Sequence, residues 1–141
     1  YWVLIFSYPE NSHTEDYRQE VLNLVNAQRA KYGLTALEMG DDALTAAAQT
    51  RAEEISVVNS HVRPDGYKCF TVLKDYGVTA TPPRENAAWG SVSPEEVVNA
   101  WMNSEGHRAN ILNPEARKMS VGYYYNSNST WGHQWIQIFT K

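Results

Sequence analysis

The sequence has 141 residues, of which 43% are hydrophobic and 20% charged, and its net charge at pH 7 is -4. This length suits one domain with a real core, and the composition fits neither a disordered chain nor a membrane-spanning one. The twelve basic residues are scattered along the chain, which argues against nucleic acid as a partner. The single cysteine, Cys69, excludes an internal disulfide, and its apolar neighbours predict a buried thiol that packs as a small hydrophobic group.

Residues 1–15 are expected to form a tail or an extra strand ahead of a single domain at 16–141. Within them, the run at 2–6 is apolar but far too short to span a bilayer. The run also lacks the basic region that precedes the apolar core of a signal peptide. An edge strand or a docked tail is the favoured interpretation, and a remnant of a cut targeting segment is the alternative.

Two helices are predicted in the first half of the chain. Apolar residues recur at helical spacing over 17–32, and Gly33 then supplies the left-handed residue that ends many helices. A second helical period, capped by Asp41 or Asp42, reaches Ile55 and carries a face of alanines. Small side chains on that face would let the helix pack flat on a sheet.

The middle of the chain combines turns, short helices and loops. A loop is predicted at 59–66, because Arg-Pro-Asp-Gly is a turn signal, and a short helix is expected over 69–76. Glu85 follows an extended segment with two prolines and is expected in a loop. The tetrapeptide Ser-Pro-Glu-Glu at 93–96 combines a capping box with proline at the first helical position, so it should begin a helix that reaches Met102.

The last part of the chain is predicted to be a β-hairpin. Larger and smaller side chains alternate over 119–125, an Asn-Ser-Asn-Ser turn follows, and 135–139 forms the return strand. Helices first and an antiparallel hairpin last point to α+β layers.

His61, Glu85 and His107 are the candidate site residues. Both histidines lie next to turn signals and acidic residues, whereas His13 and His133 are expected at the surface. Burial near tryptophan would raise the pKa of Glu85 and suit it to acid or base work. The spacing of the three residues does not by itself bring them together in space, whereas the two histidines of a His-Glu-x-x-His helix lie on one face of that helix. A polar network that stabilises loops and a shared metal or acid–base site therefore both stay open.

Four motifs occur in order along the chain and are similar to those of one known family. They are Leu-Val-Asn-Ala-Gln-Arg at 24–29, Ser-His-x-x-Pro-Asp-Gly at 60–66, Glu-Asn at 85–86, and Trp-Met-Asn-Ser-Glu-Gly-His-Arg-Ala-Asn-Ile-Leu at 101–112. Together they resemble the bacterial branch of the CAP superfamily, named for cysteine-rich secretory proteins, antigen 5 and pathogenesis-related 1 proteins. The resemblance runs from Asp16 to the C-terminus, and the last motif is its most specific part.

The resemblance implies an α+β fold, a three-layer α-β-α sandwich with a central antiparallel sheet and a large cleft. In this family two histidines and two acidic residues line the cleft and can hold a divalent cation, often zinc. Here the histidines would be His61 and His107, and the first acid would be Glu85. The second acid is open between Ser104, where the eukaryotic pattern has glutamate, and the adjacent Glu105.

The chemistry of such a site follows from its donor atoms. Two neutral imidazoles give zinc nitrogen ligands, and water can complete an open site. Glu85 would either ligate the ion or, in the interpretation we favour, orient an imidazole or a bound water. Asn86 and Ser104, which belong to the same cleft, are expected to satisfy loop backbone groups. The family's usual glycine before Glu-Asn is Arg84 here, so the charge or width of the cleft is expected to differ.

Three functions are compatible with these residues. The favoured one is a secreted module on the surface of a Gram-positive bacterium whose cleft binds a divalent cation and a lipid or peptide. It accords with the lack of a Gly-x-Ser-x-Gly nucleophile motif and with the poor placement of Cys69. The second is a metal-assisted or acid–base hydrolase, protease-like, with Glu85 as the base. The third is a cell-wall interaction module that binds partners through exposed aromatic residues.

Overall fold

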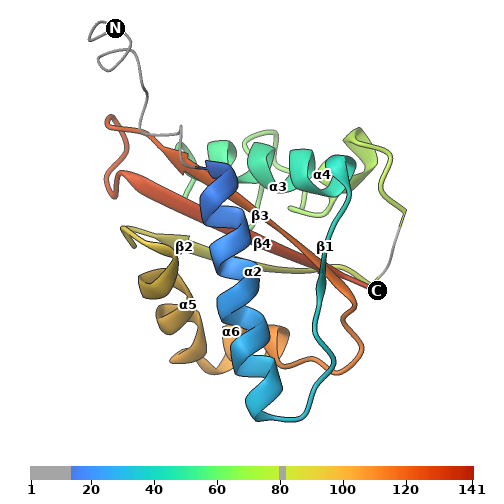
Figure 1. Ribbon diagram of the computed structural model, residues 1–141. Coiled ribbons are helices and arrows are strands. Elements are labelled where there is room, and N and C mark those ends of the chain that lie inside the picture. Colours follow the sequence, from blue (N-terminus) through green and yellow to red (C-terminus); the bar gives the residue numbers. More distant parts are fainter. Residues whose placement is uncertain (1–13, 80–81) are drawn as a thin grey trace, which may run out of the picture.

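The computed structural model describes residues 14–79 and 82–141, which form helices on both sides of a four-stranded sheet (Figure 1). The elements are, in chain order, α2 (Thr14–Lys31), β1 (Glu38–Met39), α3 (Asp42–Ile55), α4 (Thr71–Asp75), β2 (Arg84–Trp89), α5 (Pro94–Met102), α6 (Glu105–Ile111), β3 (Lys118–Tyr125) and β4 (His133–Thr140). Residues of α2, α5 and α6 pack on one face of the sheet and residues of α3 and α4 on the other. The expected three-layer α-β-α sandwich is therefore confirmed.

The predicted helix ends are formed by local hydrogen bonds. The Asp41 side chain accepts a hydrogen bond from the backbone of Leu44 and begins α3. Ser93 does the same for the backbone of Glu96 and begins α5, with proline as the first helical residue. Gly33, at φ 70°, follows the end of α2. Each cap satisfies a backbone group that the helix itself leaves without a partner.

The strand order in the sheet is β1-β3-β4-β2. The predicted hairpin is confirmed, since β3 and β4 pair antiparallel from Lys118 with Thr140 to Tyr125 with His133. β2 also pairs antiparallel with β4, but the two-residue β1 runs parallel to β3. The sheet is thus antiparallel except at β1, which is too short to show any periodicity in the sequence.

One expectation about a loop was wrong. Glu85 lies within β2 rather than in a loop, while His107 lies within the short helix α6. The sequence of β2, Arg-Glu-Asn-Ala-Ala-Trp, shows no alternation because polar residues on both of its faces are buried in hydrogen bonds. In α6 the Gly-His pair and the short length weaken the helical signal.

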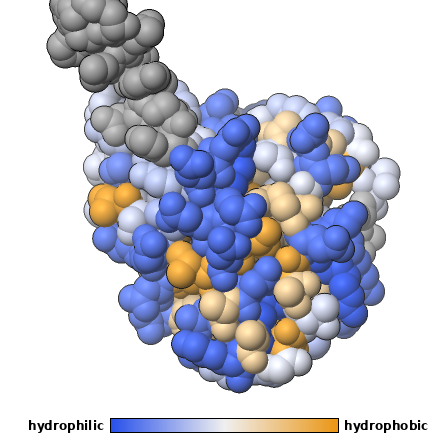
Figure 2. Space-filling view, viewed as in Figure 1, coloured by the Kyte–Doolittle hydropathy of each residue, from blue (hydrophilic) through white to orange (hydrophobic). Residues whose placement is uncertain are grey.

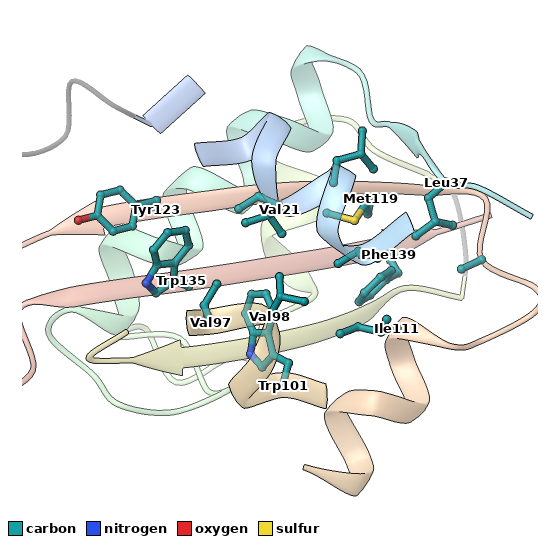
Figure 3. Packing of buried hydrophobic residues seen from close by; sticks show 14 residues of the cluster. Val21, Leu37, Val97, Val98, Trp101, Ile111, Met119, Tyr123, Trp135 and Phe139 are labelled. Atoms are coloured by element: carbon teal, nitrogen blue, oxygen red, sulfur yellow. The ribbon is translucent and has the colours of Figure 1, made fainter. Parts of the chain in front are cut away.

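The face of the sheet beneath α2, α5 and α6 holds the large side chains (Figure 3). Trp101 and Trp135 are almost wholly buried there, and their indole N–H groups donate to the backbone carbonyls of Ala87 and Ser91. The ring of Tyr17 stacks on Trp135 at a centroid distance of 5.4 Å. Each aromatic side chain of this kind removes about 150–250 Å² from water.

On the opposite face, the backbone of α3 lies very close to the backbone of the sheet. The buried residues of α3 include Ala47, Ala48 and Ala52, as the alanine face predicted. A methyl group on Gly122 of β3 would overlap the backbone carbonyl of Ala48. Helix α3 therefore lies directly on the sheet, which brings its one buried arginine, Arg51, next to β2.

Side chains cover the outer edges of the sheet. The Gln49 amide bonds both the N–H and the carbonyl of Tyr123, and the Arg18 guanidinium donates to the carbonyl of Val121. On the far edge, the Trp101 indole donates to the carbonyl of Ala87. Capped edges resist pairing with a further strand. The strand expected at 2–6, the tail at 1–15 as far as residue 13, and His13 lie outside the described residues.

The surface in the view of Figure 1 is mostly hydrophilic, with hydrophobic side chains showing in strips between polar ones (Figure 2). Among the described residues, no helix combines the length and the apolar character needed to cross a bilayer.

Candidate functional site

The site is built around the edge strand β2, whose neighbouring residues point to opposite faces of the sheet. Glu85 pairs in register with Ile138 and faces α3, where it bonds Arg51. Asn86 pairs with Gln137 and faces the other layer, where it bonds residues of α6. Because strand side chains alternate, one Glu-Asn pair connects the two helical layers across the sheet edge.

Glu85 receives charged donors on both carboxylate oxygens. Arg51 Nε lies 2.9 Å from Oε2 and Arg51 Nη2 lies 3.1 Å from Oε1. His61 Nδ1 lies 2.7 Å from Oε1. An ionised carboxylate can only accept hydrogen bonds, so His61 Nδ1 carries the proton and its Nε2 has the lone pair of the neutral ring.

The same arginine fixes the loop that carries His61. Arg51 Nη2 donates to the carbonyl of Ser60, and Nη1 pairs with Glu54 at 3.0 Å. Arg63 forms ion pairs with both Glu54 and Asp75, at N–O distances of 2.8 Å and 2.9 Å. This chain of alternating charges ties both sides of the loop to α3 and α4, so the backbone at His61 is held even though 55% of its side chain is exposed.

The environment moves the pKa of each acidic and imidazole group in a definite direction. The hydrogen bond to Glu85 raises the pKa of His61 above its ordinary value, against the effect of burial. Burial by itself would raise the pKa of Glu85, but the hydrogen bonds from His61 and Arg51 outweigh it and lower that pKa. Glu85 is therefore an ionised carboxylate at neutral pH, contrary to the raised pKa that burial alone suggested.

His107 reaches the site from α6. Burial lowers its pKa, and the positive charge of His61 lowers it further. The carbonyl of His107 accepts a hydrogen bond from Asn86 Nδ2 at 3.1 Å, and Asn110 Nδ2 donates to Asn86 Oδ1 at 2.8 Å. Asn86 therefore bonds the backbone of a helix rather than the loop backbone that was expected, and it positions α6 against β2.

Cys69 lies on the α3 side of the same carboxylate. Its sulfur, a nitrogen of His61 and an oxygen of Glu85 all lie within 4.8 Å of one another. Burial raises the pKa of the thiol to about 12, and the negative charge of Glu85 acts in the same direction. The expectation of a buried thiol is confirmed, but its position beside the candidate site was not predicted.

The remaining candidate residues lie at the start of α6 or outside the site. Ser104 is the residue before α6 and makes no side-chain capping bond, and Glu105 is exposed in the first turn. His133, expected at the surface, is half-buried, with Nδ1 2.6 Å from the hydroxyl of Tyr123. The large cleft and the choice of Ser104 or Glu105 as second acid stay predictions.

Arg51 is the functional residue that sequence analysis missed. It occupies the buried face of a helix whose other buried residues are Leu, Ala and Ile. A charged residue at such a position requires a buried partner of opposite charge. That rule could have pointed to a buried acid, although not to Glu85 in particular.

The fold and the motif residues define a class of protein, an α-β-α sandwich in which Glu85 of an edge strand bonds His61 from one layer and Asn86 bonds the backbone of His107 from the other. The model of the CAP family, described as the cysteine-rich secretory protein family, matches residues 22–139. The chain belongs to this family.

Two curated relatives come from Bacillus subtilis. The uncharacterized protein YkwD is 40% identical over 127 residues, which are 89% of this chain and 49% of YkwD. The uncharacterized membrane protein YlbC is 32% identical over 115 residues, covering 78% of this chain and 33% of YlbC. The chain thus spans half or less of the length of these relatives.

Solved structures agree with the fold. An extracellular protein with an SCP domain from Bacillus anthracis superposes with a TM-score of 0.82 at 23% identity, covering 95% of this chain and 44% of that one. An outer surface protein from Borrelia burgdorferi gives a TM-score of 0.71 at 25% identity, covering 87% of this chain and 90% of its own.

Proposed function

We propose that this chain is an extracellular ligand-binding module in which His61 and His107 hold a divalent cation, with zinc as the candidate ion. The observation that carries the proposal is the hydrogen bonding of Glu85. Its carboxylate accepts a hydrogen bond from His61 Nδ1 and is fixed in place by a second one from Arg51. A carboxylate on one imidazole nitrogen fixes the tautomer and offers the other nitrogen to a metal.

The chemistry of the donors fits such an ion. A histidine must be neutral to coordinate, and the lowered pKa of His107 keeps its ring neutral at pH 7. His61 must lose its extra proton first, so binding should weaken as the pH falls. Two imidazoles leave coordination positions for water or for a ligand group, which is the arrangement of an open zinc site.

The loop of His61 supports a lipid or peptide as the second ligand. Val62 and Tyr67 lie in this loop with 45% and 66% of their surface exposed. An apolar and an aromatic side chain beside a cation site suit a ligand with a polar head and an apolar part. Secretion to the surface of a Gram-positive bacterium is part of the same proposal, supported by relatives described as extracellular or outer-surface proteins.

The geometry favours binding over hydrolysis. A general base works best when its pKa lies near the working pH, whereas three hydrogen bonds from Arg51 and His61 lower the pKa of Glu85. Glu85 accordingly acts as a positioning residue for His61. Peptide or ester turnover that disappears in Glu85→Gln, with zinc affinity unchanged, would instead establish the hydrolase.

Calorimetric titration of the metal-stripped protein with zinc tests the proposal. We expect saturable binding of one ion and its loss in the His61→Ala/His107→Ala double variant. The matched control is His133→Ala, which removes a half-buried histidine outside the site and should bind zinc normally. Equal binding by the wild type and the double variant would contradict the assignment of these two histidines.

A further inference from the structure

We infer that Cys69, His61 and Glu85 form an alternative cation site, for a thiophilic divalent ion such as zinc, cadmium or cobalt, on the α3 side of β2, which shares His61 with the two-histidine site and is occupied in its place. This site goes beyond the proposed function because it uses a sulfur ligand and does not require His107. Its ligand atoms come from three separate segments, the loop before α4, the loop after α3, and β2.

Proximity of three different donor types carries the inference. The Cys69 sulfur, a His61 nitrogen and a Glu85 oxygen lie within 4.8 Å of one another. Sulfur, nitrogen and oxygen donors in one small group suit a borderline ion with tetrahedral geometry, with water as the fourth ligand. His61 is the exposed member of the group, with 55% of its side chain exposed, whereas Cys69 and Glu85 are buried.

Charge at the site accounts for its selectivity. Arg51 already balances the carboxylate of Glu85, at 2.9 Å. Cys69 is a buried free thiol beside this carboxylate. An ion must therefore bind the sulfur strongly enough to displace its proton, which magnesium and calcium do not do.

The binding step balances in charge and protons. The thiol of Cys69 releases one proton to solvent as the sulfur–metal bond forms, and no atom changes its oxidation state. The neutral imidazole of His61 supplies a lone pair and keeps its one N–H on the other nitrogen. Thiolate and carboxylate then supply two negative charges beside the dication and Arg51.

A titration of the metal-stripped protein with cobalt(II) tests the site, because a cobalt–thiolate bond has a charge-transfer band in the near ultraviolet that histidine ligands do not produce. We expect this band to appear at one equivalent. It should persist in His107→Ala, the matched control, and disappear in Cys69→Ser. The dissociation constant of the sulfur-containing site should rise at least about tenfold in that variant, since loss of a partner outside the ligand set already costs this much.

The outcomes distinguish the Cys69 site from the site of His61 and His107. Cobalt binding without the thiolate band, or a band that Cys69→Ser retains, would overturn the Cys69 site and leave the His61 and His107 proposal standing. Loss of the band in His107→Ala would show that the site is not separate. A folded Cys69→Ala variant, checked by its circular dichroism, must also lack the band.

Discussion

Both faces of the sheet are buried, but they are made of different residues. Beneath α2, α5 and α6 lie Trp101, Trp135, Tyr123 and Phe139. Beneath α3 lie alanines and the ion pair of Arg51 with Glu85. The aromatic face removes apolar area from water, while the alanine face brings charged groups to fixed positions. The layer of α3 thus contributes the ion pair that holds His61, whereas the aromatic layer contributes His107 from α6.

The largest effect is expected on the aromatic face. Trp101→Ala should lower the free energy of unfolding by about 3–5 kcal/mol, because it removes a buried side chain and leaves a cavity. Urea denaturation measures this change. Trp131, with 56% of its surface exposed, is the matched control, and Trp131→Ala should change stability by less than about 0.5 kcal/mol. Equal effects would contradict the assignment of the aromatic core.

On the opposite face, Glu85→Gln should cost about 3 kcal/mol, because it leaves the buried guanidinium of Arg51 without a full counter-charge. The double variant Arg51→Met/Glu85→Gln should recover part of that loss, since the buried charge is then gone. Urea denaturation of the wild type, the single variant and the double variant at pH 7 measures these changes in the free energy of unfolding. A double variant less stable by the sum of both single effects would show that the pair is not coupled.

The close approach of α3 to the sheet predicts a smaller loss of stability when a side chain is added between them. Gly122→Ala should cost about 2 kcal/mol, because the added methyl group meets the backbone of Ala48 and the helix must move. Gly106→Ala is the control, since a methyl group there meets nothing within 4 Å and suits helix α6. Thermal unfolding of both variants tests the difference, and a stable Gly122→Ala protein would refute the tight contact.

The smallest expected effect is a pH dependence. The pKa of His61 is raised in the folded state, so its protonated form stabilises the fold below pH 6.5, and that contribution is lost as the pH rises through the raised pKa. His107, with its lowered pKa, acts in the opposite sense and loses stability as the pH falls. The difference in Tm between the metal-stripped wild type and His61→Asn should therefore be largest at low pH and shrink above neutrality. A difference that grows with pH would contradict the pairing with Glu85.

Much of the fold follows from local sequence signals, whereas the site depends on contacts between distant residues. Caps at Asp41 and Ser93 and the hairpin alternation are local and were predicted correctly. The strand that contains Glu85 was missed because both of its faces are buried. Its polar and apolar residues therefore do not alternate, and alternation is the signal by which a strand is predicted. The partnership of Arg51 with Glu85 joins residues 34 positions apart. No period or spacing in the chain encodes it, and only the family motifs pointed to His61, Glu85 and His107 together.

We propose that His61 and His107, from opposite layers, bind one cation at the edge of β2. The most direct test is an NMR titration of the metal-stripped protein with zinc, following the imidazole signals of each histidine. We expect the signals of His61 and His107 to shift together and to saturate at the same zinc concentration, while that of His133 stays in place. If zinc moved His61 and left His107 unchanged, the two-histidine site would be contradicted.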